Sequence, residues 1–63
     1  MCESNAYMKN GDEEELLLSE VAVVEPVPGG FRLVGLFGDE LTVTGRLSGI
    51  NLLKHKIIFE KDG

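Results

Sequence analysis

Closely spaced turn signals divide this chain of 63 residues into short segments of a length typical of β-strands. The signals are Asn10-Gly11, the loop sequence Pro26-Val27-Pro28-Gly29-Gly30, Gly38-Asp39 and Ser48-Gly49. Asparagine and glycine tolerate the positive φ angles of a tight reversal, and proline lacks a backbone donor. The pattern therefore predicts a chain that reverses direction repeatedly.

The segments between these turns carry the marks of strands. Residues 2–8 alternate in side, residues 16–25 are rich in Val and Leu, and Pro26 is expected to end that second run. A helix over 13–20 is the alternative, but the β-branched Val21, Val23 and Val24 favour a strand. Residues 31–37 and 41–47 predict a hairpin, and 57–59 a final strand after a turn at 53–56.

Gly38-Asp39 predicts the register of the central hairpin if the two residues form its loop. Leu36 then faces Leu41, and Val34 faces Val43, on the side expected to be core. Phe31, Leu33 and Phe37 fall on the other side, where a solvated face would be polar. This hairpin is therefore expected to be covered on both faces, partly by barrel closure and partly by another subunit.

The apolar alternation slips one residue after Leu47, and Ser48-Gly49 lies at the slip, so a bulge or corner is expected there. The whole pattern predicts one all-β domain over residues 1–63. The expected form is a small β-barrel of five to six short antiparallel strands, of the SH3-like, Sm-like or OB-like kind.

Composition limits the partners of such a domain. The chain is 43% hydrophobic, which suits a packed core, but at 63 residues that core is only marginally stabilising, so a second subunit is expected to help. No apolar run is long enough to cross a bilayer, and no signal peptide is recognisable. A net charge of −5 disfavours nucleic acid. The single cysteine forms no internal disulfide, which predicts a cytoplasmic location.

Several short sequences resemble the CooT family of small nickel-binding proteins along nearly the whole chain. They are Met1-Cys2-Glu3, Ala6-Tyr7, Asn10-Gly11, Leu36-Phe37-Gly38-Asp39-Glu40, Ile50-Asn51-Leu52 and Lys56-Ile57-Ile58-Phe59. The resemblance implies a homodimer of β-barrel protomers that binds Ni(II) through Cys2 and assists a nickel client, carbon monoxide dehydrogenase for the namesake. The same family is also catalogued as predicted RNA-binding, which is the alternative function. Ser4-Asn5 is more polar than the family pattern.

Cys2 has chemistry that suits this role, because a thiolate with nitrogen donors favours square-planar Ni(II). Removal of Met1 would free an α-amine and create an N,S chelate, to which the Glu3 nitrogen or a second Cys2 can add. Zinc fits worse, since structural zinc takes four Cys or His ligands and the chain has one of each; a dimer, with two of each, keeps zinc as an alternative. The plainer interpretation of a lone cysteine is a small apolar residue.

The remaining polar groups predict no second site. His55, between two lysines, is expected to be a solvated turn residue, and Glu13, Glu14 and Glu15 a solvated hairpin flank. The candidates for a basic patch do not share one face in the predicted register; they are Arg32, Arg46, Lys54 and Lys56. No spacing supports Cys2 and His55 as nucleophile and base, and no phosphate-binding loop is recognisable. A non-enzymatic role is expected.

Overall fold

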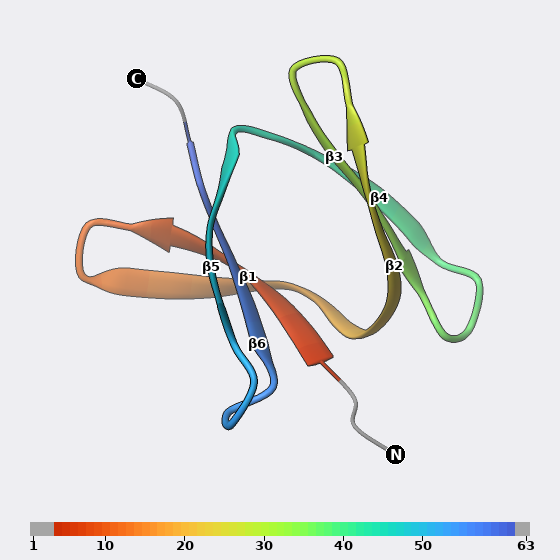
Figure 1. Cartoon of the computed structure of the whole chain (residues 1–63), viewed down its shortest axis with the longest axis horizontal. Helices are drawn as coiled ribbons and strands as arrows, with labels where there is room; N and C mark the ends of the chain where they lie inside the picture. Colours follow the sequence, from red (N-terminus) through yellow and green to blue (C-terminus); the bar gives the residue numbers. More distant parts are fainter. Residues whose placement is uncertain (1–3, 62–63) are drawn as a thin grey trace.

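The computed structural model describes residues 4–61, which form one sheet of six strands (Figure 1). The spatial order of the strands is β4-β3-β2-β1-β6-β5. The all-β prediction is confirmed for this part of the chain, and the strand preferred over a helix at residues 16–25 is present. The strands are β1 (Ser4–Asn10), β2 (Glu13–Val27), β3 (Gly30–Gly35), β4 (Glu40–Thr44), β5 (Arg46–Asn51) and β6 (Lys56–Glu60).

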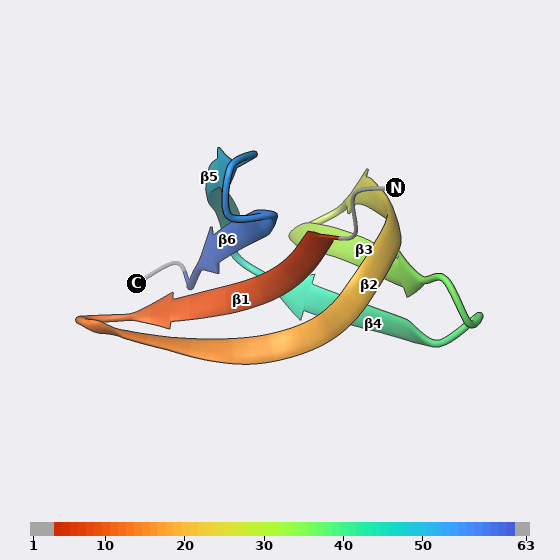
Figure 2. The same ribbon diagram turned by 90° about the horizontal axis from the view of Figure 1, so that it is seen from below.

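β2 is a long bent strand that joins the two halves of the sheet. Its first part pairs with β1 and its second part with β3, and Figure 2 shows it curving from one to the other. Pro26 does not end the strand as predicted; it pairs with Phe31, and β2 continues to Val27. The proline lies one residue before the end of β2, beyond the part of the strand that pairs with the described residues of β1, a position where proline is tolerated in a sheet.

β1 and β6, the first and last strands, lie side by side and run parallel. Asn5 pairs with Lys56 at one end of this ladder, and Lys9 pairs with Glu60 at the other. The prediction of antiparallel strands throughout was therefore wrong for this pair. Local turns join only antiparallel neighbours, so a pairing between the ends of the chain leaves no local signal in the sequence.

The hairpin of β3 and β4 has a different register from the predicted one. Leu33 lies opposite Leu41, and Phe31 opposite Val43, whereas Val34 pairs with Glu40. The register shift turns Phe31 and Leu33 toward the core and Val34 away from it. One side of the hairpin thus carries Phe31, Leu33, Leu41 and Val43, which the prediction had divided between two sides.

The loop of this hairpin explains the shift. Gly38 donates its N–H to the Gly35 carbonyl at 3.1 Å, and Gly35 donates to the Asp39 carbonyl at 2.8 Å. Leu36 and Phe37 therefore occupy the centre of the turn, and Gly38, with a φ of 90°, follows as a glycine bulge. This loop uses three residues where Gly38-Asp39 predicted two.

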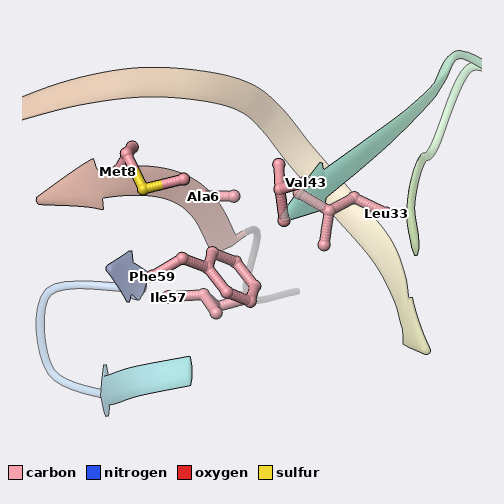
Figure 3. Packing of buried hydrophobic residues seen from close by; sticks show 6 residues of the cluster. All are labelled: Ala6, Met8, Leu33, Val43, Ile57 and Phe59. Carbon is pink, nitrogen blue, oxygen red and sulfur yellow. The ribbon is translucent and has the colours of Figure 1, made fainter. Parts of the chain in front are cut away.

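The core lies between the two halves of the bent sheet (Figure 3). Phe59 and Leu33 are fully buried, and the Phe59 ring meets the Phe31 ring at a centroid distance of 5.3 Å. Burial of side chains of this size is the main stabilising contribution in such a small domain. The buried residues are Ala6, Met8, Leu33, Val43, Ile57 and Phe59.

The sheet is not closed into a barrel, and the SH3-like detail of the prediction is not confirmed. The described strands β4 and β5 form the two edges and do not pair with each other. Gly45 alone separates them in sequence, and its N–H bonds to the Gly29 carbonyl at 3.3 Å. The chain turns a corner there and leaves the β4 edge for β6, so the two edge strands meet only at Gly45.

Candidate functional site

Cys2, the predicted metal ligand, lies outside the described residues, so its coordination stays a prediction. The structure does show where the chain enters the sheet after it. Ser4 pairs with Val21 of β2, and the Asn5 N–H donates to the His55 carbonyl at 2.8 Å. β1 therefore begins between the bend of β2 and the turn at residues 52–55.

A bulge in β2 faces this first part of β1. Ser4 pairs with Val21 and Ala6 with Leu18, so Asn5 lies opposite two residues of β2. One of them, Glu20, has a φ of 54°, a left-handed conformation that is uncommon for residues with a side chain. The Glu20 N–H donates a hydrogen bond to Oδ1 of the Asn5 side chain at 3.1 Å.

The same bulge also contacts the loop between β3 and β4. The Glu20 carbonyl accepts a hydrogen bond from the Leu36 N–H at 2.8 Å. Together with the bonds of Asn5, this joins the β3–β4 loop, the β2 bend, the start of β1 and the turn at 52–55. We call this group of segments the amino-terminal rim; its loops lie in the lower half of Figure 1.

Large apolar side chains are exposed on the two loops of the amino-terminal rim. Phe37 is 81% exposed, although its phenyl ring was expected to serve packing, and Leu53 is 93% exposed. Leu36 and Leu52 are at least half exposed beside them. Single exposed apolar residues are common, but two such pairs, one on each side of the start of β1 (Figure 1), make these loops candidates for a contact surface.

Metal donors are sparse in the described part of the chain. Residues 4–61 contain no group of three His, Cys, Asp or Glu side chains that could hold a metal ion. His55 is half-buried rather than fully solvated, and its carbonyl is bonded to Asn5. The only imidazole of the chain thus belongs to a residue that touches the start of β1, a proximity that the sequence could not reveal.

Most of the candidate basic patch is occupied by ion pairs. Arg32 bonds to Glu25 at 3.0 Å and to Glu40 at 3.2 Å, and these carboxylates, Glu40 foremost, raise its pKa. Arg32 pairs with Thr42 in the register of the structure, which differs from the predicted one. Arg46 bonds to Glu60 at 3.1 Å. Cations paired in this way leave little positive potential for a phosphate backbone.

Lys56, another residue of the candidate basic patch, is also paired with a carboxylate. Its Nζ lies 2.8 Å from the Glu14 carboxylate and 4.9 Å from the centroid of the Tyr7 ring. The hydrogen bond to Glu14 raises the pKa of Lys56, and the same bond lowers the pKa of Glu14. Glu13, Glu14 and Glu15 are exposed, as predicted for a solvated flank.

The described residues include no helix able to span a membrane.

A family model and a solved structure similar to this chain name the same family. The family model described as CO dehydrogenase accessory protein CooT matches residues 1–60. An uncharacterised protein of Methanothermobacter thermautotrophicus is 36% identical over 62 residues, which cover 98% of this chain and 92% of that protein. A crystal structure assigned as CooT from Carboxydothermus hydrogenoformans superposes with a TM-score of 0.90 at 32% identity, covering 98% of this chain and all of that chain.

Proposed function

The chain belongs to the CooT family of CO dehydrogenase accessory proteins, and on this basis we propose that it binds Ni(II) through Cys2. The observation that carries the proposal is the extent of the family match, which begins at residue 1 and so includes Cys2. The family is one of accessory proteins rather than catalysts. We therefore propose a non-enzymatic, cytoplasmic role in supplying nickel to a client enzyme.

The donor chemistry of Cys2 supports nickel over harder metals. A thiolate is a soft ligand, and with nitrogen donors it favours square-planar Ni(II). After removal of Met1, the α-amine and the thiol of Cys2 form a five-membered chelate, and backbone nitrogen can extend it. Carboxylates would suit calcium or magnesium instead, and within residues 4–61 the exposed glutamates of the β1–β2 hairpin belong to no group of three side chains that could hold a metal ion.

We also propose that two protomers share the nickel site. The chain has one cysteine and one histidine, so a single protomer offers few strong donors. The exposed apolar side chains of the amino-terminal rim lie on the loops that flank the start of β1. A homodimer that covers Leu36, Phe37, Leu52 and Leu53 would bring two Cys2 residues toward each other and remove these side chains from water.

Native mass spectrometry of untagged protein, with and without nickel, tests both parts of the proposal. We expect removal of Met1, a dimer and about one nickel ion per dimer, with a thiolate-to-nickel absorption band. Cys2→Ser should abolish the band and the bound metal, whereas Ser4→Ala, a change at the nearest hydroxyl side chain, should leave both intact. Nickel binding by Cys2→Ser at unchanged affinity would refute the assignment.

An RNA-binding role, the alternative, makes a different prediction in the same samples. Metal-free protein would retain RNA on a column, the retention would fall with rising salt, and Cys2→Ser would retain as much RNA as wild type. We expect no such retention, because Arg32, Arg46 and Lys56 are paired with glutamates.

A further inference from the structure

The loop that joins β1 to β2 is a tight turn that begins after Asn10. Asn10 forms the last pair of the hairpin, with Glu13, so Gly11 and Asp12 are the two residues of the loop. Gly11 has a φ of 66° and Asp12 does not share a positive φ, which is the pattern of a type II′ turn. Figure 2 shows this loop at the tip of a hairpin that projects from the sheet.

The backbone nitrogen of Gly11 is open to reaction with the side chain before it. In a type II′ turn the residues that flank the loop exchange the hydrogen bonds, and within residues 4–61 the Gly11 N–H forms none. A Cβ at position 11 would meet no atom within 4 Å, so the loop is not crowded by other segments. Glycine itself has no side chain to obstruct a close approach to its backbone.

The side chain of Asn10 differs from those of the other two asparagines of the chain. Asn5 Oδ1 accepts a hydrogen bond from the Glu20 N–H at 3.1 Å, and Asn51 Oδ1 accepts one from the Lys54 N–H at 3.0 Å. Asn10 is exposed, and within residues 4–61 its side-chain amide makes no hydrogen bond. Asparagine is a thermolabile residue, and a carboxamide that is not held can rotate toward the nitrogen of the next residue.

We propose that Asn10 is a site of spontaneous deamidation in the folded protein. The Gly11 nitrogen loses its proton to hydroxide and attacks Cγ of Asn10, so an N–Cγ bond forms and the Cγ–Nδ2 bond breaks. Ammonia leaves with a proton taken from water, which restores the hydroxide. Water then opens the succinimide ring at either of its carbonyl carbons and leaves an aspartyl or an isoaspartyl residue. Neither the reaction nor its test involves Cys2 or nickel.

Either product adds a carboxylate to an acidic part of the surface. The four residues after Gly11 are all acidic, and one more negative charge takes the formal net charge from −5 to −6. Isoaspartate also adds a carbon to the backbone at the residue that pairs with Glu13, so the last pair of the hairpin is lost. Because β1 stays paired with β6 from Asn5 to Lys9, the change is confined to the tip of the hairpin.

The test follows the purified full-length protein during incubation at neutral and at mildly alkaline pH, with peptide mapping by mass spectrometry at intervals. We expect the mass difference between an amide and an acid to appear at Asn10 alone, in both aspartyl and isoaspartyl forms, at a rate that rises with pH. Gly11→Ala should slow the reaction, because the new Cβ hinders the approach of the nitrogen. Asn10→Gln should stop it, because a larger ring would have to form.

Leu52→Gly is the matched control, because it places a glycine after an asparagine whose side chain is bonded to Lys54. In this variant Asn51 should still react more slowly than Asn10. Equal rates at the two asparagines would overturn the argument from the unbonded carboxamide. Folded wild type that keeps Asn10 intact, while protein unfolded in guanidinium chloride loses the amide there, would show that the turn protects this residue, and the proposal would be refuted.

Discussion

Replacing Gly45 with alanine tests the corner between the two edge strands. Gly45 has a φ of 129°, and a Cβ placed there would overlap the carbonyl oxygen of Glu60 and lie 3.1 Å from its carbon and 3.2 Å from the Cα of Lys61. All of these atoms belong to the backbone of β6 and the residue after it. No rotamer change can therefore relieve the contact, and the strand itself must move.

Two costs add in this variant. An unfavourable positive φ costs about 1–3 kcal/mol, and forcing extra volume into a packed site costs about 1–3 kcal/mol. A domain of 63 residues has a total stability of about 3–9 kcal/mol. A combined loss of about 2–6 kcal/mol therefore removes a large part of that stability. Since about 1 kcal/mol shifts the melting temperature of a small domain by about 4–8 °C, we expect a decrease of at least about 8 °C.

Gly49→Ala is the matched control for this prediction. Gly49 lies in the neighbouring strand β5, and a Cβ there would meet no atom within 4 Å. Thermal and urea unfolding followed by circular dichroism should show Gly49→Ala within about 0.5 kcal/mol of wild type. A Gly45→Ala protein as stable as Gly49→Ala would refute the close approach of the corner to β6.

Three further predictions test the core, a surface ion pair and the proposed interface. Phe59→Ala should lose about 3–5 kcal/mol in urea unfolding, because the ring is fully buried against Phe31; a loss below about 1 kcal/mol would contradict this packing. The folded-state pKa of Glu14 lies below its ordinary value of 4.5, so the stability from its bond to Lys56 is present above pH 4.5 and lost as pH falls through the lowered pKa. Glu14→Gln should flatten that acid-induced decrease in melting temperature, and an unchanged pH profile would argue against the bond. Phe37→Glu should lower the dimer fraction in sedimentation velocity, whereas an undiminished dimer would exclude this loop from the interface.

Features that depend on neighbouring residues could be predicted from the sequence. Asn10-Gly11 marks a reversal, and the structure joins β1 to β2 there by a two-residue loop. The parity slip at Ser48-Gly49 corresponds to a register shift in the β5–β6 pairing. The turn predicted at 53–56 is present one residue earlier, at 52–55. In each case the signal and the structure lie within a few residues of each other.

The β3–β4 loop shows the limit of this local reasoning. Gly38-Asp39 has the composition of a two-residue loop, but Gly35 closes a longer one by bonding to Asp39. Both loops satisfy local turn chemistry, and burial of Phe31 and Leu33 on one face decides between them. A register is therefore fixed by packing that the isolated hairpin sequence does not contain.

The candidate site was beyond local prediction for a similar reason. Asn5 and Glu20 are far apart in sequence, and the hydrogen bond between them depends on a bend in β2 that the composition does not indicate. His55 was correctly placed in a turn, but its contact with Asn5 depends on the parallel pairing of β1 with β6. Cys2 could be selected from the resemblance to the family and from thiolate chemistry.

The parallel pairing of β1 with β6 also determines when this domain can fold. β1 has β2 on one side and β6 on the other, and the β6 contacts join residues separated by nearly the whole chain. Such high contact order slows folding, since a long loop must close before its contacts stabilise anything. A nascent chain that has not yet exposed β6 lacks Ile57 and Phe59 and leaves the buried face of β1 open to water. Folding is therefore completed only after the last strand has left the ribosome.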